Sequence, residues 1–366
     1  MADYIKLVKS LEELTAFKAS NDFVTPNVTA IFGDKIVDYN PIPNYLKFTA
    51  EEDNSTISLN SKTSPDIKYS LNGGEWTQWD YSAITLNTGD TVRMKGNNSN
   101  GFSTSNSSYN QFQMTGKIGA SGNIMSLLYD NDFEGKLTIP CIYCYSSMFS
   151  GCTSLANAPE LPATTLAERC YNGMFSGCTS LVNAPELPAT TLANDCYSNM
   201  FNGCTSLANA PELPATTLTE RCYNCMFIGC TSLVNAPELP ATTLAESCYS
   251  SMFRDCTSLT NAPELPATTL AKRCYSNMFN SCKSLVNAPE LLATTLDNYC
   301  YSSMFFGCSK LNYIKMLATN IRANYCLDGW VHGVSSTGTF VKHPNMTSLP
   351  TGDSGIPNGW TVQDAA

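Results

Sequence analysis

Apolar residues recur along the second half of the chain in a phrase of 26 residues. The phrase is first complete at 144–169, where it reads CYSSMFSGCTSLANAPELPATTLAER. A repeat of about 20 to 50 residues is typical of a solenoid, in which each unit buries its apolar face against its neighbours. Further copies begin at Cys170, Cys196, Cys222, Cys248, Cys274 and Cys300, and a broken eighth begins at Cys326.

The first half of each unit has helical spacing. Cys144, Met148 and Cys152 stand at i, i+4 and i+8, and an aromatic residue follows the first cysteine and the methionine. This is the buried stripe of a short amphipathic helix. We expect Gly151 to end that helix, because a residue without Cβ readily adopts the left-handed conformation.

The second half of each unit has an extended pattern. Leu155 to Ala158 is too short for a helix and is closed by Pro159, so we predict a short strand that pairs in parallel with its equivalents. An Asn recurs two positions after each Leu, and we expect its amide to bond to the backbone of the next coil. The Leu column is Leu155, Leu181, Leu207, Leu233, Leu259, Leu285 and Leu311, and the Asn column is Asn157, Asn183, Asn209, Asn235, Asn261 and Asn287.

The predicted fold class is a mixed α/β solenoid of short parallel strands and short helices, preceded by a small all-β Ig-like sandwich and an N-terminal anchor. A capping box at Ser10 and Glu13 predicts a helix in the anchor, and NVTAIF and KIVDY predict a hairpin. Short alternating segments with turn residues between them predict the sandwich, in which Trp76 and Trp79 are interpreted as packing residues in preference to a sugar platform. The predicted divisions are 1–44 (anchor), 45–116 (sandwich), 117–143 (N-terminal cap), 144–325 (seven repeats) and 326–366 (C-terminal cap).

Charge and hydropathy exclude some classes of partner. The formal net charge is −10, and no stripe of Lys and Arg is present, which argues against a nucleic-acid-binding surface. No run approaches the 18 or more apolar residues typical of a membrane span, so we expect no membrane insertion. Residues 1–22 contain no apolar core of a signal peptide, and we expect the chain to fold in a cytoplasm.

Cysteine is abundant, with 17 residues, of which 15 fall in two columns at 144 and 152 plus multiples of 26. We expect these to be buried free thiols, because a helix would hold the two cysteines of one unit too far apart for a disulfide. Pairing between coils is possible in distance but disfavoured by a reducing compartment. No His accompanies the columns, and the pair Cys141 and Cys144 has no second pair at zinc-finger spacing, so we predict no metal or other cofactor. Cys225 is expected to be a partly exposed thiol without an assigned role.

Catalytic chemistry has little support, and we predict that the chain is not an enzyme. His332 and His343 are the only histidines, and both lie in the predicted C-terminal cap. One Glu recurs per coil, but a single carboxylate is not an acid–base pair. We interpret this acidic ridge as a solvated edge, with a cation or receptor-contact ridge as the alternative. It consists of Glu160, Glu186, Glu212, Glu238, Glu264 and Glu290.

Two positions of each coil vary from copy to copy: the residue after Met-Phe and the residue before the next Cys. Such variety would be costly in a packed core, so we expect these residues to be exposed. Aromatic and Arg side chains dominate binding hot spots. The candidate receptor contacts are therefore Ile228, Arg254, Arg273, Tyr299 and Phe306. The alternative is drift on an unused face.

The repeated phrase MF-x-GC-x-SL, followed by proline and leucine, resembles the BspA-like class of bacterial leucine-rich repeats over residues 144 to about 325. The order of a PNVT-to-DYNP segment, a sandwich, a GNIMSLLY cap, the repeats, a KMLATNI exit and a GIPNGWTV end is similar to proteins of phages and prophages of anaerobic gut bacteria. The second resemblance implies a homo-oligomeric virion fibre or appendage. Its N-terminal segment would bind other virion proteins, and its repeats would contact a host cell-surface glycan or protein. The first resemblance alone implies a surface adhesin of the bacterial host.

Overall fold

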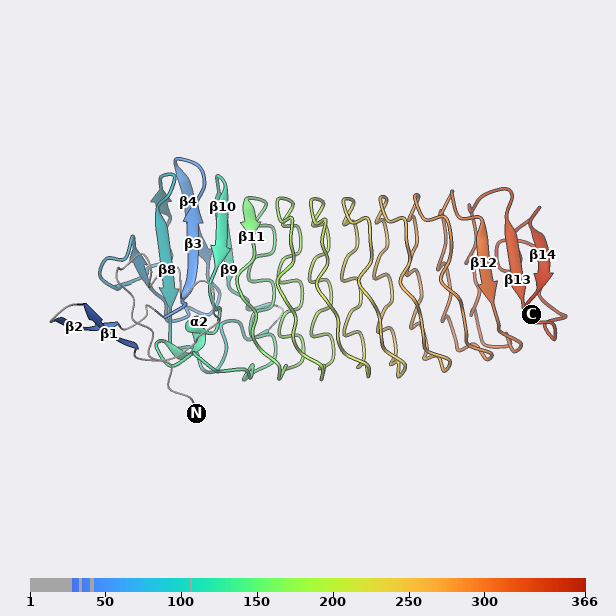
Figure 1. The fold of residues 1–366 in the computed structure, drawn as a ribbon, viewed down its shortest axis with the longest axis horizontal. Coiled ribbons are helices and arrows are strands. Elements are labelled where there is room, and N and C mark those ends of the chain that lie inside the picture. Colours follow the sequence, from blue (N-terminus) through green and yellow to red (C-terminus); the bar gives the residue numbers. More distant parts are fainter. Residues whose placement is uncertain (1–27, 33–34, 40–42, 106) are drawn as a thin grey trace. The chain divides into compact units, whose positions relative to one another are not determined.

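The computed structural model describes residues 28–32, 35–39, 43–105 and 107–366 (Figure 1). The chain divides into two compact units, Met1–Asn44 and Tyr45–Ala366. In the first unit, β1 (Val28–Phe32) pairs antiparallel with β2 (Lys35–Tyr39), which confirms the predicted hairpin. The helix predicted after Ser10 lies outside the described residues, and the role of this unit as an anchor stays a prediction.

The second unit begins with two β-sheets. Burial alternates along β3 and β4, as expected of strands with one face on a core. Phe48 of β3 contacts Phe112 of β9 with ring centroids 5.2 Å apart, so the core lies between the sheets. Trp79 is also buried in this core, as predicted. The strands are β3 (Leu46–Ala50), β4 (Ser55–Asn60), β5 (Lys68–Leu71), β6 (Thr77–Gln78), β7 (Ile84–Leu86), β8 (Thr91–Lys95) and β9 (Gln111–Thr115), and one sheet has the order β7-β4-β9.

The larger sheet continues into the first repeat. Its order is β11-β10-β3-β8-β5-β6, where β10 (Ile118–Ser121) pairs antiparallel with β3 and parallel with β11 (Leu155–Asn157). Phe112 stacks on Phe149 of the first coil at 5.3 Å. The two β-sheets thus close the N-terminal end of the repeat core.

The first half of each coil is not helical, and the prediction of short helices is wrong. Backbone N–H groups there bond alternately within a turn and to the next coil. Met252 N–H donates to the Tyr249 carbonyl at 3.2 Å, whereas Phe253 N–H donates to the Met278 carbonyl of the next coil at 2.9 Å. Among the described residues, the single α-helix is α2 (Ser126–Tyr129), so the chain is a β-rich repeat protein with almost no helix.

The turns recur every fourth residue, which explains why the apolar spacing resembled a helix. In the first coil Tyr143, Ser147 and Gly151 have φ values of 58°, 57° and 72°, and the equivalent residues of later coils are also left-handed. Residues at i, i+4 and i+8 therefore face the core in this segment just as they would on a helix of 3.6 residues per turn. Gly151 has the left-handed conformation that was predicted, but it continues a series of turns and ends no helix.

The interior of the stack consists of columns of identical side chains. Every member of the Leu column is fully buried, as predicted. Phe rings of successive coils stack at 5.5 to 5.8 Å from Phe149 to Phe305, and Tyr rings stack at 5.8 to 6.1 Å from Tyr145 to Tyr301. Each coil therefore buries its apolar face against the coils on either side.

The extended half of the coils pairs in parallel, as predicted, but within the repeats only β11 of the first coil and β12 (Tyr313–Met316) of the seventh are long enough to be strands. Later coils pair through single bridges such as Asn183 with Asn209. The side-chain amide of Asn209 donates to that of Asn183 at 2.7 Å, and Asn261 donates to Asn235 at 3.2 Å. In these two pairs the bond joins two side chains, which corrects the expected bond to the backbone.

A parallel sheet closes the C-terminal end. It contains β12 (Tyr313–Met316), β13 (Thr339–Lys342) and β14 (Thr361–Asp364) in that order. Trp330 is fully buried against Phe305, with ring centroids 6.1 Å apart, and its indole N–H donates to the Gly355 carbonyl at 2.9 Å. No helix in the described part of the chain is long and apolar enough to cross a membrane.

Candidate binding surface

The column cysteines are buried thiols of the repeat core. All fifteen are buried, as predicted, and all 17 cysteines are free. The second cysteine of a coil donates its S–H to a Phe carbonyl of the preceding coil, as Cys256 does to Phe227 at 3.0 Å. Burial raises the pKa of Cys256 to about 12. Such thiols remain protonated near neutral pH, so they are poor nucleophiles and poor metal ligands.

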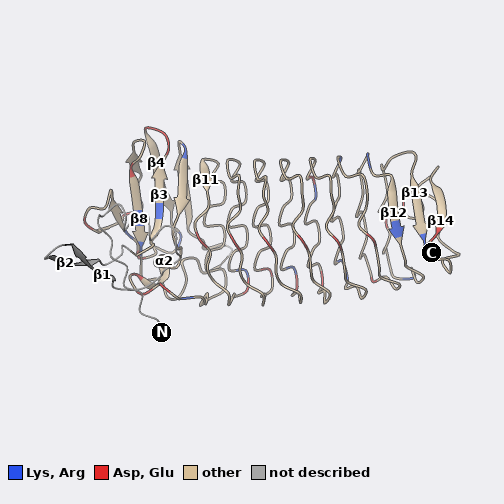
Figure 2. Cartoon of the chain, in the orientation of Figure 1, with Lys and Arg blue, Asp and Glu red and all other residues tan. Residues whose placement is uncertain are grey.

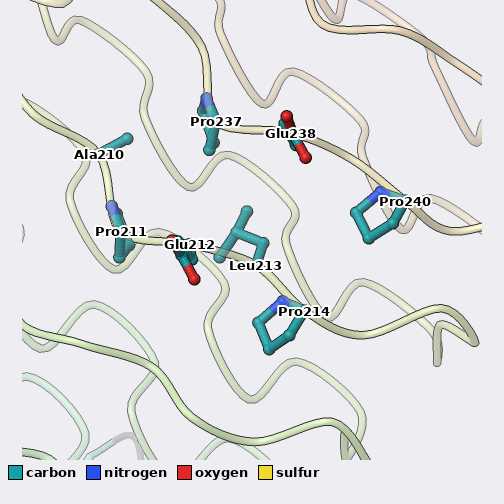
Figure 3. Close-up of a pocket in the computed structure, with 8 residues that line it drawn as sticks. All are labelled: Ala210, Pro211, Glu212, Leu213, Pro214, Pro237, Glu238 and Pro240. Atoms are coloured by element: carbon teal, nitrogen blue, oxygen red, sulfur yellow. The ribbon is translucent and has the colours of Figure 1, made fainter.

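The acidic ridge runs along the exposed face of the extended halves. All six glutamates are exposed, and Figure 2 shows acidic residues, coloured red, recurring from coil to coil. Glu290 pairs with Lys315 at 3.0 Å. Between the third and fourth coils, Glu212 and Glu238 border a shallow groove of about 400 Å³ (Figure 3). The groove is lined by Ala210, Pro211, Glu212, Leu213, Pro214, Pro237, Glu238 and Pro240.

This groove lacks the features of a metal centre. Within the described residues, no three His, Cys, Asp or Glu side chains are grouped so that they could hold a metal ion. A cation on the ridge would therefore meet at most two carboxylates, which is few for Ca²⁺. Cation binding by the ridge stays a prediction.

The variable positions form two rows on the turn halves of the coils. The pre-cysteine row is Tyr143, Arg169, Asp195, Arg221, Ser247, Arg273, Tyr299 and Tyr325, and the post-phenylalanine row is Ser150, Ser176, Asn202, Ile228, Arg254, Asn280, Phe306 and His332. The pre-cysteine residues all have positive φ. Asp195 and Ser247 of this row are buried, which corrects the expectation that every member of the row is exposed. Both have short side chains, and the carboxylate of Asp195 is covered by the Arg169 guanidinium at 3.2 Å.

Arg273 and Tyr299 are brought together by the structure. The Arg273 guanidinium carbon lies 4.7 Å from the Tyr299 ring centroid, and the Tyr299 ring stacks on Tyr325 at 5.0 Å. Tyr325 is 61% exposed. These three residues therefore make a continuous cation and aromatic ladder at the C-terminal end of the pre-cysteine row, and we call it the Arg-Tyr-Tyr ladder.

Phe306 also has a partner in the next coil. Its ring stacks on the His332 imidazole at 4.8 Å, and His332 Nδ1 lies 2.7 Å from Asp353 Oδ2. Phe306 is 39% exposed. His332 thus sits in a surface stack with a carboxylate partner, and neither contact supplies a nucleophile.

The other two candidate contacts lie earlier in the same row. Ile228 is half-buried and Arg254 is exposed, and they occupy neighbouring coils. Arg254 pairs with the adjacent Asp255 at 3.3 Å. Because this pair is exposed, its contribution to stability is small, about 0 to 1 kcal/mol.

Tyr325 and His332 were missed by reasoning from the complete repeats, because Tyr325 is the last residue before the broken eighth copy and His332 lies within it. The register alone could have found them. Adding 26 to 299 gives 325, and adding 26 to 306 gives 332. The residue sequence of the repeat changes at this end, but the two surface rows continue through one more coil.

Comparisons with known proteins add a limited finding. No protein-family description matches the sequence, and no curated protein matches it either. Among solved structures, the chain is similar to a leucine-rich repeat protein from Bacteroides ovatus ATCC 8483, at 17% identity and a TM-score of 0.29. The match covers 60% of this chain and 63% of that chain, so it spans less than two thirds of the neighbour. At this TM-score the likeness carries no argument about function.

Proposed function

We propose that the chain is a leucine-rich-repeat solenoid of the BspA-like type that serves attachment and has no catalytic activity. In this proposal it is a fibre or appendage of a phage particle, and its repeats contact a glycan or protein on the host cell. The observation that carries the attachment role is the Arg-Tyr-Tyr ladder together with the Phe306–His332 stack. Large aromatic and Arg side chains held on a rigid scaffold have little entropy left to lose on binding.

The location of these side chains supports the proposal. The aromatic residues among the exposed large hydrophobic side chains of the described chain are Phe306 and Tyr325. Both lie at the C-terminal end of the coils, where the earlier coils carry Ser, Asn, Asp or Arg at most equivalent positions. An exposed aromatic side chain contributes little to the fold, so its apolar surface is free to contact a partner.

Attachment can be tested by replacing the row residues together. Changing Ile228, Arg254, Arg273, Tyr299 and Phe306 to Ser, with Tyr325→Ser and His332→Ser added, should abolish binding of the purified chain to host cells. The matched control replaces Val182, Val234 and Val286 by Ser, because these exposed apolar residues lie in another column of the repeats. Normal binding by the row variant, or equal loss in the control, would refute the proposal.

The particle-binding role is assigned to residues 1–44, with other virion proteins and further copies of the chain as partners. Support comes from the division of the chain into separate compact units after Asn44. A chain of residues 45–366 should keep the circular dichroism spectrum of the repeats but fail to join particles. Normal incorporation of the shortened chain would contradict the assignment.

The repeat class itself favours a second candidate, a surface adhesin of the bacterial host. Mass spectrometry separates the two possibilities. A virion component should be found in stoichiometric amounts in purified phage particles, whereas an adhesin should be found in the surface fraction of uninfected cells. Both candidates use the same pre-cysteine and post-phenylalanine rows for attachment, but they place the protein on the phage particle or on the bacterial cell surface.

A further inference from the structure

A pair of cysteines lies where the N-terminal sheets meet the first coil: Cys141 is outside the two columns, and Cys144 is the first column cysteine. Cys141 and Cys144 are three residues apart, and the turn between them contains Tyr143 with φ of 58°. Their thiols share a side-chain hydrogen bond. Cys144 is fully buried, whereas Cys141 is half-buried. The pair therefore has one sulfur that a small molecule can reach and a second sulfur directly behind it.

One loop of the N-terminal sheets packs on both cysteines. The Ser103 N–H donates to the Cys144 carbonyl at 2.7 Å, and the Phe102 N–H faces the Cys144 sulfur. The Cys141 sulfur lies so close to Gly101 that a Cβ there would have no room. These contacts hold the two sulfurs in place, so the pair is preorganised.

The electrostatic environment distinguishes Cys141 from the other thiols. The hydrogen bond from Cys144 lowers the pKa of Cys141, whereas burial raises the pKa of Cys144. Cys225, the other half-buried cysteine, has a pKa raised by burial. Since the thiolate is the nucleophile in disulfide exchange, Cys141 should react first among the 17 cysteines.

We propose that Cys141 and Cys144 form a reactive dithiol site that a small-molecule disulfide of the glutathione type converts to an intramolecular disulfide. The Cys141 thiolate attacks one sulfur of the small disulfide, which forms a mixed disulfide and releases one small thiolate. Cys144 then gives its proton to solvent and attacks the Cys141 sulfur, which forms the Cys141–Cys144 bond and releases the second small thiol. Two protein thiols are oxidised and one small disulfide is reduced to two thiols.

The geometry suits the second step. Disulfide formation brings two sulfurs to about 2 Å, and these sulfurs start from hydrogen-bond contact. By contrast, burial raises the pKa of Cys225, and the other column cysteines are buried, as Cys256 is with its pKa raised to about 12. Oxidation should therefore stop after one disulfide, with 17 − 2 = 15 thiols left.

The test uses the full chain, reduced and then incubated with oxidised glutathione. After acid quenching, free thiols are alkylated, the disulfides are reduced, and the newly freed thiols are labelled with a second reagent before tandem mass spectrometry. The second label is expected on Cys141 and Cys144 alone, at a rate at least about tenfold above that of Cys225. A mixed disulfide that persists on Cys141, or labelling that appears first on Cys225 or on a column cysteine other than Cys144, would overturn the proposal.

Variants sharpen the result. Cys144→Ser should accumulate the mixed disulfide on Cys141, because the resolving thiol is missing, and Cys141→Ser should form neither product. Cys225→Ser is the matched control and should oxidise like the parent chain. If a buried substitution disrupts folding, the labelling of the parent chain still decides the question, because it needs no variant.

Discussion

Phe227 and Ile228 are neighbours in the chain but belong to different parts of a coil. Phe227 is fully buried between Phe201 and Phe253, with ring centroids 5.6 and 5.7 Å away. Ile228 is half-buried in the post-phenylalanine row, where other coils carry Ser, Asn, Arg or Phe. A ring in an interior column packs against the equivalent rings of the coils on both sides, so its size and shape are restricted. A row residue lies at the surface, so it only has to be compatible with the backbone turn that carries it. The interior columns therefore repeat one side chain, and the surface rows are free to vary.

Alkaline pH should unfold the chain by destabilising the interior columns, and we expect this to be the largest effect on stability. Burial raises the pKa of Cys152, Cys170, Cys204, Cys222, Cys256, Cys300 and Cys308 from an ordinary value of 9.0 to about 12. Stability is complete below pH 9, where both states are protonated, and falls as the unfolded chain ionises between pH 9 and about 12. Each such thiol costs up to about 1.4 kcal/mol per pH unit in this window.

With seven such thiols, the free energy of unfolding falls by up to about 10 kcal/mol per pH unit. This is comparable to the total stability of a domain. Circular dichroism with reductant present should show cooperative unfolding within about one to two pH units above pH 9. Cys225→Ser should not move the midpoint appreciably, since it removes one half-buried thiol. A folded chain at pH 12 would contradict the expectation.

Phe227→Ala should be the most damaging single substitution considered for the columns. It removes two ring contacts and leaves a cavity in a close-packed core, at a cost of about 3 to 5 kcal/mol in the free energy of unfolding. The matched control is Val234→Ala in the same coil, because Val234 is 45% exposed and should change stability by less than about 0.5 kcal/mol. Denaturant unfolding of both variants measures the difference. Equal effects would mean that the columns do not carry the stability of the stack.

Substitutions at the left-handed turn residues should lower the free energy of unfolding less than Phe227→Ala does. Gly229 has φ of 69°, and an added Cβ would contact nothing closer than 3.8 Å, so Gly229→Ala should cost about 1 to 2 kcal/mol through backbone strain alone. Cys225→Asn instead introduces a residue that suits the left-handed conformation, because Asn occupies the equivalent left-handed positions at Asn199 and Asn277. This variant should be neutral or slightly stabilising in thermal unfolding. A large loss at Cys225→Asn would show that packing, rather than φ, dominates there.

The surface rows should show the smallest effect on stability. Replacing Ile228, Arg254, Arg273, Tyr299 and Phe306 by Ser removes exposed or half-buried side chains, so the midpoint of thermal unfolding should move by only a few degrees. This variant compares interior and surface most directly, because the same five changes, with Tyr325→Ser and His332→Ser added, are expected to abolish attachment. A strongly lowered midpoint would show that the Arg273–Tyr299 contact is part of the fold.

Several features of the site could be predicted from the sequence, and others could not. The candidate contacts were located by their variety, and the structure places Arg273 directly against Tyr299. The burial of Asp195 was not predicted, because it depends on the Arg169 side chain of the preceding coil. The role of the column cysteines as donors to Phe carbonyls was also not predicted, since the bond joins residues 29 positions apart.

The sequence by itself determined the 26-residue register, the buried Leu, Phe and Cys columns and the variable rows. These follow from repetition, because a residue that faces the core in one coil faces it in every equivalent coil. Only the tertiary structure decided that the turn segment is not a helix. An apolar residue at every fourth position fits both a helix and a series of left-handed turns. The turns form because alternate backbone N–H groups of this segment bond to carbonyls of the next coil, one repeat of 26 residues further along the chain. Hydrogen bonds to a neighbouring coil cannot be read from the spacing within one coil, and the same is true of the contact that joins Tyr299 to Tyr325.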